Sequence, residues 1–514
     1  MVDQTICIHI FRRDYRLEDN TTLIEACKTH DIVLPIFIFT KTQIDKKINT
    51  YRSDNCVQFL CESLKDLDIQ LQNISDNKKH KSSLTIFYAD DKHNEYSILD
   101  TLIKTISNVK TISFNMDYTY YSKIRDDKIK KLCDTNYIQC LSLDDICINP
   151  IGSVVTSSGK PYSKFTPYWK ESASREIRKI VSNKYKNYYN NNTHDNIRSS
   201  LKKLNKYILS IEDIMKPNGL IMGTINIQIP ERGGRENGLK ILHNMKKWDD
   251  YNDDRDMLSY KTTHLSPFNK FGCVSIREVY WTMLKKLGKD GEFGLIRQLF
   301  WRDFFYNISY CYPKEVYKES ALNPKYRNIK WHHNKTSMDK FNKWCKGETG
   351  YPIVDACMRE LNTTGYMHNR GRLITANFLC RLLHIDWKLG EKYFASKLYD
   401  YDPAQNNFGW QVSGANSSGT TSRPLSQTIM NPWLQSAKHD TDALYIKLWC
   451  PELKNVKASH LHKWYDYYKN YELGSDSGSG SSNSNTTKVK YYPPIIDYTI
   501  EKEKNLKMYE KYLQ

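Results

Sequence analysis

The sequence lacks several features that would assign it to a particular class of protein. Its 13 cysteines include no CxxC pair and no repeated spacing, so neither a zinc ribbon nor a disulfide framework is predicted. Apolar runs are too short to span a bilayer, and the N-terminal stretch "MVDQTICIHIFRRDYRLEDN" lacks the long apolar core of a signal peptide. We therefore expect a soluble intracellular protein without a metal site, in the cytoplasm or the nucleus.

Positive charge and aromatic residues are abundant. The 76 lysine and arginine residues exceed the 58 acidic residues, which gives a net charge of +18. Such an excess fits a polyanionic partner such as nucleic acid, but on charge alone it fits a lysine-rich surface equally well. The 37 tyrosines and 11 tryptophans supply large rings that pack in cores and stack on flat ligands.

The first third of the chain has the pattern of an α/β domain. Short apolar runs at residues 5–11, 32–39, 83–89 and 111–116 alternate with segments of helical periodicity. Strands that are apolar throughout predict a parallel sheet with helices on both faces. We expect residues 1–145 to form a doubly wound, Rossmann-like domain, although no GxGxxG follows its first strand, so NAD binding is not supported there.

The rest of the chain is predicted to be mostly helical. Residues 146–215 are polar and read as an interdomain linker, and residues 216–472 carry the strong helical periodicity of a second, mostly α domain. Residues 473–487 are rich in Gly, Ser and Asn and are expected to be a flexible loop. Residues 488–514 return to helical character as a terminal helix.

Residues 400–410, "DYDPAQNNFGW", combine acids, amides and aromatics. A calcium loop is disfavoured because Pro403 and Ala404 stand where further oxygen ligands would continue. Two acids so close in sequence also differ from glycosidase carboxylates, which usually come from separate elements. A polar turn, with Asp402 as the N-cap of a helix that starts at Pro403, and a wall around a cofactor both remain open.

Two further segments have polar residues in a helical context. Asn369 and Arg372 are three apart and share a helix face, which is either solvated or turned inward toward a carboxylate such as Asp400 or Asp402. The segment "KTTHLSPFNKFG" places three hydroxyls just before a helix, which suits phosphate binding but is also common in capping turns.

Taken in order, these segments resemble the photolyase and cryptochrome family. The resemblance covers nearly the whole chain and rests on "FRRDYRLEDN", "YNDDRD", "TTHLSPFNKFG", "FWRDFFY", "GETGYPIVDACMREL", "GYMHNRGRLITANFL", "DWKLGEKYF", "DYDPAQNNFGW" and "WCPEL". Within the family the chain looks most like class I cyclobutane pyrimidine dimer photolyases. The resemblance implies an antenna-binding α/β domain, a linker, and a helical domain that holds FAD.

The resemblance also implies roles for individual residues. In the family's pattern Arg372 pairs with Asp400 over the flavin, Asp402 contacts the cofactor, and Asn406 faces flavin N5. Trp410, Trp387 and Trp331 match the tryptophans that pass an electron to photoexcited FAD. The full set expected to bind FAD is Tyr251, Thr262, Thr263, Leu265, Ser266, Arg302, Asn369, Arg372, Asp400, Asp402 and Asn406.

The implied activity is light-dependent DNA repair. A pyrimidine dimer flips out of the duplex, and an electron from photoexcited reduced FAD splits its cyclobutane ring. Damaged DNA is the expected partner, no membrane partner is expected, and the protein is expected to be a monomer. The residues expected at the substrate or the DNA backbone are Gln298, Trp301, Asn369, Leu373, Arg255 and Arg370.

Three positions depart from the class I pattern. Gln298 stands where a cavity glutamate is usual, Val412 where a second cavity tryptophan is usual, and His264 where an arginine is common. These departures keep two alternatives open: a cryptochrome photoreceptor without repair, and (6-4) photoproduct repair. The latter ranks lower, because Asn369 and Leu373 replace the histidine pair of (6-4) enzymes. A basic nucleic-acid-binding protein without a cofactor is the third alternative, from a different class.

A second, antenna chromophore is the least defined part of the resemblance. Members that bind methenyltetrahydrofolate often have a glutamate after the fourth strand, where this chain has Thr119. Methenyltetrahydrofolate, a deazaflavin or a flavin, or no antenna at all, remain the alternatives.

Overall fold

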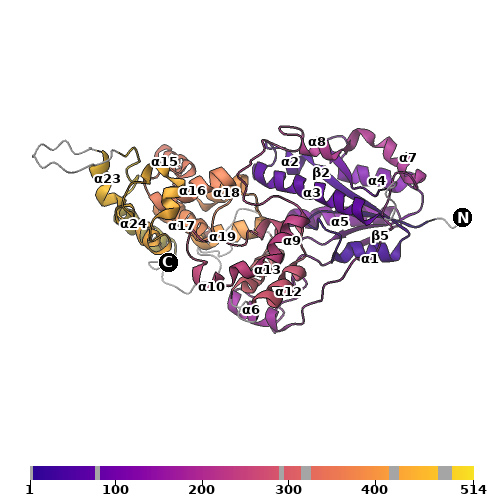
Figure 1. Cartoon of the computed structure of the whole chain (residues 1–514), viewed down its shortest axis with the longest axis horizontal. Coiled ribbons are helices and arrows are strands. Elements are labelled where there is room, and N and C mark those ends of the chain that lie inside the picture. The colour runs from indigo at the N-terminus through magenta and orange to yellow at the C-terminus, as the bar shows by residue number, and fades with distance from the viewer. Residues whose placement is uncertain are drawn as a thin grey trace, which may run out of the picture. The chain divides into compact units, whose positions relative to one another are not determined.

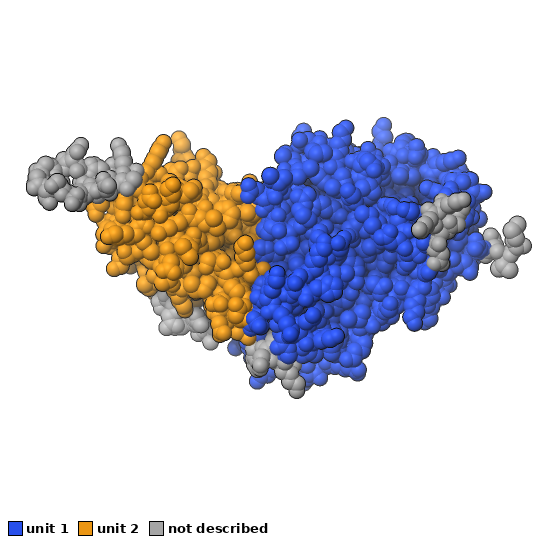
Figure 2. Space-filling model, in the orientation of Figure 1, with its two compact units in different colours: residues 1–249, 263–317, 399–405 blue, residues 250–262, 318–398, 406–514 orange. Residues whose placement is uncertain are grey.

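The computed structural model describes residues 4–75, 81–288, 294–313, 326–415, 428–472 and 489–513. The chain forms two compact units (Figures 1 and 2). Unit 1 comprises Met1–Asp249, Thr263–Tyr317 and Tyr399–Gln405, and unit 2 comprises Asp250–Thr262, Lys318–Leu398 and Asn406–Gln514. None of the described helices is both long and apolar enough to cross a bilayer.

Unit 1 is built on a six-stranded sheet in the order β5-β4-β1-β2-β3-β6. All neighbouring strands are parallel except β6, which runs antiparallel to β3 at the edge. The register pairs Ile6 with Ile32 and Ile10 with Ile36 between β1 and β2. The strands are β1 (Ile6–Ile10), β2 (Ile32–Thr40), β3 (Thr85–Ala89), β4 (Val109–Asn115), β5 (Gln139–Leu143) and β6 (Ile208–Leu209).

The sequence explains the central strands directly. Every residue of β1 and β2 is buried, as expected for strands covered by helices on both faces. The doubly wound α/β prediction is confirmed, and each of the four apolar runs forms a strand. The pattern did not identify β5, "QCLSL", which is only partly buried, or the two-residue β6.

Short polar side chains set the starts of several helices in unit 1. Asn20 and Asn94 cap α1 and α4, and Ser275 forms a capping box with Glu278 at the start of α12. The helices of this unit are α1 (Thr21–Thr29), α2 (Lys41–Ile44), α3 (Asp54–Ile74), α4 (Glu95–Thr105), α5 (Tyr120–Thr135), α6 (Phe165–Ser174), α7 (Asp195–Lys203), α8 (Ile211–Met215), α9 (Arg235–His243), α11 (Ser266–Phe271), α12 (Ile276–Leu287) and α13 (Leu295–Cys311).

The segment expected to be an irregular linker, residues 146–215, has regular structure. It contains α6, α7 and α8, and it supplies β6, whose Leu209 pairs with Ile86 of β3. The linker prediction from polar composition was wrong because a few apolar residues are enough for this segment to pack on one edge of the sheet and on α13. It is therefore part of unit 1 rather than a free connection.

A buried ion network joins the sheet to helices far along the chain. Arg16 on the loop after β1 contacts Asp145 at 2.5 Å, and Arg277 on α12 contacts Asp19 and Asp145 at 2.7 Å each. All four side chains are at most 3% exposed. These pairs, 129 to 258 residues apart in sequence, hold α12 in unit 1. Helices α11 and α13 also belong to unit 1, whereas the expected helical domain began at residue 216.

Unit 2 is helical, as predicted. Its core includes Trp344 and Trp464, which are at most 1% exposed, and Arg381, which is 1% exposed. The described helices are α10 (Tyr251–Asp254), α15 (Lys335–Lys346), α16 (Pro352–Thr364), α17 (Asn369–Asn377), α18 (Trp387–Lys397), α20 (Pro432–His439), α21 (Leu444–Trp449), α22 (Ala458–Leu461), α23 (Trp464–Glu472) and α24 (Tyr498–Leu513).

Helix α19 (Pro403–Ala415) begins in unit 1 and continues into unit 2. The expected Gly/Ser/Asn loop at 473–487 lies outside the described residues. The terminal helix was expected over residues 488–514, and α24 begins ten residues later than expected, at Tyr498, after the prolines at 493 and 494.

Candidate functional site

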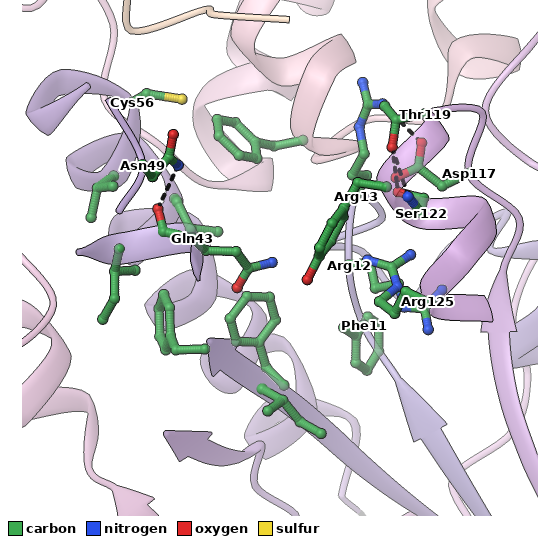
Figure 3. A pocket seen from close by; sticks show the side chains of 18 of the residues that line it. Phe11, Arg12, Arg13, Gln43, Asn49, Cys56, Asp117, Thr119, Ser122 and Arg125 are labelled. Carbon is green, nitrogen blue, oxygen red and sulfur yellow. Dashed lines mark hydrogen bonds and ion pairs between the residues drawn. The ribbon is translucent and has the colours of Figure 1, made fainter. Parts of the chain in front are cut away.

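A cavity of about 300 Å³ lies in unit 1 where strands β1 and β2 end. Its lining includes Ile10–Arg13 from the end of β1, Phe37–Phe39 from β2, and Asp117 and Thr119 after β4. The strand order reverses between β1 and β4, and ligands of open α/β sheets bind in the crevice at this point. Figure 3 shows Arg12, Arg13, Asp117 and Arg125 along one side and Gln43, Asn49 and Cys56 along the other.

The walls of this cavity are aromatic and cationic. Five basic side chains line it against two carboxylates, and eight aromatic rings contribute to its surface. Arg12 and Arg125 share one carboxylate, Asp126, at 2.6 and 2.9 Å, so the pair keeps a net positive charge. Lys270 lies within 5.5 Å of the Tyr401 ring. Arg13 and Arg52 are paired with Asp402 and Asp54, so the positive charge that remains is that of Arg12 and Arg125. Together with the flat rings, it suits a planar, anionic ligand.

Thr119, where folate-binding members often have glutamate, lines the cavity and also caps α5. Its Oγ1 accepts a hydrogen bond from the main-chain N–H of Ser122 at 3.1 Å. A hydroxyl in this role starts the helix and adds no negative charge to the cavity.

Asp402 lies at the centre of a buried polar cluster in unit 1. Its carboxylate accepts hydrogen bonds from Arg13 at 2.6 Å, from Tyr118 at 2.7 Å and from Tyr306 at 2.8 Å. It also accepts from the main-chain N–H groups of Ala404 and Gln405, which confirms the predicted N-cap of α19. Burial would raise the pKa of Asp402, but the charges of Arg13 and Lys270 and the phenol hydrogen bonds lower it to about 2.

The predicted FAD-binding residues of unit 1 cluster around the start of α11. Ser266 donates to the carboxylate of Asp400 at 2.7 Å, and both Thr263 and Leu265 are buried. His264, between them, has a φ of 51°, a left-handed conformation that few non-glycine residues adopt. The turn therefore has a defined, unusual shape.

Arg302 is fixed mainly by protein groups. Its guanidinium contacts Asp303 at 2.8 Å and donates to the main-chain carbonyls of Ile146 at 2.9 Å and Asn269 at 3.3 Å. Its Nε is buried and has no hydrogen-bond partner among the described residues. One donor thus remains for a ligand, as its expected cofactor role requires.

In unit 2, Asn406 on α19 is oriented by the main chain of α18. Its Nδ2 donates to the carbonyl of Glu391 at 3.0 Å, which fixes the amide, and no described residue donates to its Oδ1. The free oxygen is an acceptor, which suits the N–H at N5 of a reduced flavin. The residue present therefore fits the cofactor that the resemblance implies.

Trp410, also on α19, is 2% exposed and packs closely on α18. A Cβ on Gly390 would lie 2.2 Å from the Trp410 ring, so only glycine leaves room there. The ring of Trp410 lies 4.9 Å from that of Phe394 and 6.1 Å from that of Trp344, between centroids. Nothing in the sequence distinguishes Trp344 from the other tryptophans, whose large rings commonly pack in cores.

The other two tryptophans of the predicted relay, Trp387 and Trp331, lack the ring contacts that Trp410 makes. Trp387 at the start of α18 is 2% exposed, and Trp331 is half-buried. Neither ring makes an aromatic ring contact with a described residue. The three-tryptophan relay therefore stays a prediction, and the structure adds Trp344 beside its first member.

The predicted residues of α17 and the neighbouring turn are also in unit 2. Asn369 is exposed, Arg370 forms an ion pair with Asp256, and Leu373 is half-buried. Arg372 is half-buried and donates from Nε to the carbonyl of Met367 at 2.8 Å.

The remaining unit 2 positions lie around residues 251–262. Arg255 lies over the ring of Tyr251 at 6.0 Å, and the hydroxyl of Thr262 is 3.0 Å from that of Tyr366. All four side chains therefore make contacts within unit 2.

Two predicted substrate residues lie on α13 of unit 1. Gln298 is half-buried and donates to the carbonyl of Gly294 at 3.4 Å. One face of the Trp301 indole is covered by Phe165, with ring centroids 3.5 Å apart and an interplanar angle of 8°. A flipped base could therefore stack only on the opposite face of Trp301.

Several residues of these sites carried no signal in the sequence. Tyr118 and Tyr306 stack on each other with centroids 4.1 Å apart and both donate to Asp402, and Arg13 lies 4.9 Å from the Tyr118 ring. They are separated by up to 389 residues in the chain, so only the fold brings them together. Arg13 stands within the quoted segment "FRRDYRLEDN", which was the one available hint.

Two family models match most of the chain. Residues 7–183 match the DNA photolyase model, and residues 295–511 match the model of the FAD binding domain of DNA photolyase. The chain is 32% identical to a deoxyribodipyrimidine photo-lyase of Buchnera aphidicola subsp. Baizongia pistaciae, with 97% of each chain covered.

Solved structures give the same result. A crystal structure of an archaeal photolyase from Sulfolobus tokodaii, described with two FAD molecules and the implication of a novel light-harvesting cofactor, is 32% identical, with a TM-score of 0.75. The match covers 99% of this chain and 100% of that chain. A bacterial class III photolyase from Agrobacterium tumefaciens is 25% identical, with a TM-score of 0.81, and 100% of this chain and 98% of that chain are covered.

Proposed function

Because the chain belongs to the photolyase and cryptochrome family, we propose that it is a photolyase that repairs cyclobutane pyrimidine dimers in DNA. The main support is the match to a deoxyribodipyrimidine photo-lyase over 97% of each chain. Helix α19 adds support, because it holds Asn406 with a free amide oxygen and Trp410 in a buried position. When bound, reduced FAD supplies a photoexcited electron that splits the dimer. The net charge of +18 supports a DNA partner.

The chain's own residues are proposed to hold and tune the cofactor. Asn406 offers its Oδ1 to flavin N5, because its Nδ2 is held by the Glu391 carbonyl. Arg302 offers its remaining donor, Nε. The other proposed FAD ligands are Tyr251, Thr262, Thr263, Leu265, Ser266, Asn369, Arg372, Asp400 and Asp402. Of these, Asp402 has most of its acceptor capacity taken by protein donors and is proposed to act mainly by fixing the start of α19.

The other residues that the resemblance assigns are proposed to serve the substrate and the electron relay. Trp301 is proposed to stack on the flipped dimer with its uncovered face, and Gln298, Asn369 and Leu373 to complete the substrate cavity. Arg255 and Arg370 are proposed to contact the DNA backbone. Trp410, Trp387 and Trp331 are proposed to deliver an electron that regenerates reduced FAD.

The cavity at the ends of β1 and β2 is proposed to bind an antenna chromophore. Its cationic, aromatic lining favours a planar anionic molecule of the flavin or deazaflavin class, and Thr119 stands where folate-binding members often have a glutamate. The related archaeal structure described with two FAD molecules supports a flavin as the second chromophore.

Illumination of the reduced holoprotein with DNA that contains defined lesions tests the proposal. We expect cyclobutane dimers to be restored to monomers in blue light and not in darkness. Full FAD occupancy without any turnover would instead favour a cryptochrome photoreceptor, and turnover of (6-4) photoproducts alone would favour the other repair activity.

The antenna proposal is tested separately. Chromophores released from the purified protein by denaturation are separated and identified, and the apoprotein is reconstituted with FMN, FAD or a deazaflavin. We expect the second chromophore to be lost on Arg125→Ala while FAD in the helical part is retained. Binding of methenyltetrahydrofolate in place of a flavin would contradict the proposal.

A further inference from the structure

Glu501, Asn505 and Tyr509 are spaced four residues apart on α24, so they form one stripe along a face of this helix. All three side chains are at most 9% exposed. Helix α24 packs on the π-helical turn Phe378–Leu382, which continues α17 (Figure 1). The proposed function gives none of these three residues a role.

His384, two residues after this turn, is held by the stripe. Its Nε2 donates to Oε2 of Glu501 at 2.7 Å, and its Nδ1 accepts from Nδ2 of Asn505 at 3.4 Å. An amide nitrogen only donates, so Nδ1 of His384 carries no proton and the imidazole is neutral. Burial favours this form, because it lowers the pKa of His384 although the hydrogen bond to Glu501 acts in the opposite direction. The side chain is 3% exposed and is bonded at both ring nitrogens, so its position is fixed.

His384 also connects the chain segments of two tryptophans of the proposed relay. It has a φ of 55°, a left-handed conformation, and Trp387 follows three residues later at the start of α18. Its main-chain carbonyl accepts from the N–H of His332 at 3.0 Å, and the two imidazole rings lie 5.3 Å apart between centroids. His332 directly follows Trp331 in the chain. One buried residue therefore links the segment of Trp331 to the segment of Trp387.

The stripe on α24 contacts the same two segments a second time, through Tyr509. The ring of Tyr326, five residues before Trp331, lies 5.9 Å from the Tyr509 ring between centroids. The guanidinium carbon of Arg381, in the π-helical turn, lies 4.1 Å from the centroid of the Tyr509 ring. Helix α24 thus holds the segment before Trp331 and the turn before Trp387 with one face.

We propose that His384 is a positioning residue of the electron relay: held by α24, it sets the separation between Trp387 and Trp331. This inference rests on the relay in the proposed function. The rate of electron transfer between two rings falls steeply with their separation, so a small shift of either segment slows the step. Bond-forming steps are similarly sensitive, since a misplacement of about 1 Å can cost about 100-fold in rate.

The principal variant is His384→Gly. Glycine adopts a left-handed φ without strain, so the variant keeps the backbone shape and the carbonyl that accepts from His332, and it loses the side chain held by α24. Photoreduction of oxidised FAD in the holoprotein is measured in light with an external reductant. We expect its rate to fall by about 10-fold, because the relay step depends on position. The fluorescence lifetime of FAD, which reports the first transfer from Trp410, is expected to stay unchanged.

Variants of Glu501 test whether α24 acts through His384. Glu501→Gln keeps an acceptor for Nε2 of His384 and is expected to keep photoreduction within about 2-fold of normal. Glu501→Ala removes the acceptor and is expected to slow photoreduction as His384→Gly does. The double variant should be no slower than His384→Gly alone, because both changes remove the same attachment. Circular dichroism and FAD absorbance verify folding and loading, and Glu501→Ala carries the test if His384→Gly does not fold.

Tyr491→Phe provides the matched control. It removes a buried hydrogen bond in unit 2, from the Tyr491 hydroxyl to Asp355 at 2.6 Å, without touching His384 or its partners. We expect it to lower the thermal unfolding temperature as His384→Gly does and to leave photoreduction normal. Repair by chemically reduced protein does not use the relay, so His384→Gly should repair dimer DNA at the normal rate once its FAD is reduced.

The outcomes separate this inference from the proposed function. Normal photoreduction by His384→Gly, alongside its loss in Trp387→Phe and Trp331→Phe, would overturn the positioning role and leave the relay intact. Equal losses in His384→Gly and Tyr491→Phe would overturn it as well, because they would show a general weakening of unit 2. If Trp387→Phe and Trp331→Phe photoreduce FAD normally, the relay is wrong and this inference falls with it. A protein with intact photoreduction that repairs no dimers would contradict only the proposed repair.

Discussion

Arg13 donates from Nη2 to the carboxylate of Asp402 at 2.6 Å in the interior of unit 1, across 389 residues of sequence. The carboxylate is also the N-cap of α19, the helix that carries Asn406 and Trp410. The loop after the first strand is thereby connected to the start of the helix proposed to face the flavin. A change at Asp402 should affect both stability and the position of α19.

Replacing Asp402 with asparagine should make this connection visible in the pH dependence of stability. The pKa of Asp402 is lowered to about 2, below the value of about 3.9 for an unfolded aspartate. Its contribution is therefore complete above about pH 4 and is lost as the pH falls toward 2, and it amounts to about 2 to 3 kcal/mol at pH 7. We expect Asp402→Asn to be less stable than the unaltered protein by that amount at pH 7.

Urea unfolding monitored by circular dichroism at a series of pH values measures this difference. The gap between the two proteins should close between about pH 4 and pH 2, since the wild-type carboxylate is then protonated as well. Asp91, which pairs with Lys41 at the surface, provides the control, and Asp91→Asn should change the unfolding free energy by less than about 0.5 kcal/mol. A gap that stays constant over this pH range would show that the carboxylate charge is not the cause.

Two arginines that each approach both Asp19 and Asp145 should differ sharply in their contribution to stability. Arg277 is 3% exposed and contacts both carboxylates at 2.7 Å, whereas Arg178 is 43% exposed and lies 3.9 Å from each. Arg277→Ala leaves two buried carboxylates with one fewer partner and should cost about 3 to 5 kcal/mol. Arg178→Ala should cost less than about 1 kcal/mol. Thermal unfolding compares the two variants, and equal losses would contradict the role assigned to burial.

The sequence predicted the strands of unit 1 better than it predicted which later helices belong to this unit. The runs around Ile8 and Leu34 are apolar throughout, and a buried parallel strand is one of the few structures that such a run can form. The pairing of Arg16 with Asp145 and of Arg277 with Asp19 leaves no local pattern, because each partner is an ordinary charged residue until the fold buries it. Helices α11 to α13 were therefore expected in the helical domain, and they fold with the sheet.

In the candidate sites, too, local features were predicted from the sequence and contacts between distant residues were not. Pro403 after Asp402 predicted a capped helix start correctly, because capping depends on neighbours in the chain. The stack of Phe165 on Trp301 could not be predicted, since Phe165 lies in a polar segment that read as a linker. Pairings of this kind depend on which helices pack together, and that is decided by residues far from either ring.

Gln298 and Val412 depart from the class I pattern of the substrate cavity, so restoring the usual residues is expected to raise the affinity for dimer DNA. If these positions form part of the dimer cavity, Gln298→Glu with Val412→Trp should restore a charged acceptor and a stacking ring. One base stack contributes about 1 to 3 kcal/mol, so affinity for dimer DNA should rise by about 10-fold, with affinity for undamaged DNA nearly unchanged. Electrophoretic mobility shift with both DNAs measures this selectivity. Equal gains on both DNAs would indicate a general effect on DNA binding, contrary to the assignment.

The neighbours of Trp410 allow the electron route to be tested one tryptophan at a time. Phenylalanine is much harder to oxidise than tryptophan, so Trp410→Phe should abolish the photoreduction of oxidised FAD, measured by the loss of its absorbance in light with an external reductant. Trp387→Phe should have the same effect if the predicted relay is right. The structure adds Trp344, fully buried and 6.1 Å from Trp410 between ring centroids, as a comparison at a similar position in the core.

Trp344→Phe should leave photoreduction near its normal rate, because the predicted relay leaves Trp410 through Trp387 and Trp331. The variant loses the hydrogen bond from the indole to the Thr375 carbonyl, so thermal unfolding must show that it remains folded. If Trp344→Phe slows photoreduction as much as Trp410→Phe while Trp387→Phe does not, the electron travels through Trp344. The relay would then follow the ring contacts of the core rather than the tryptophans that the family resemblance assigned.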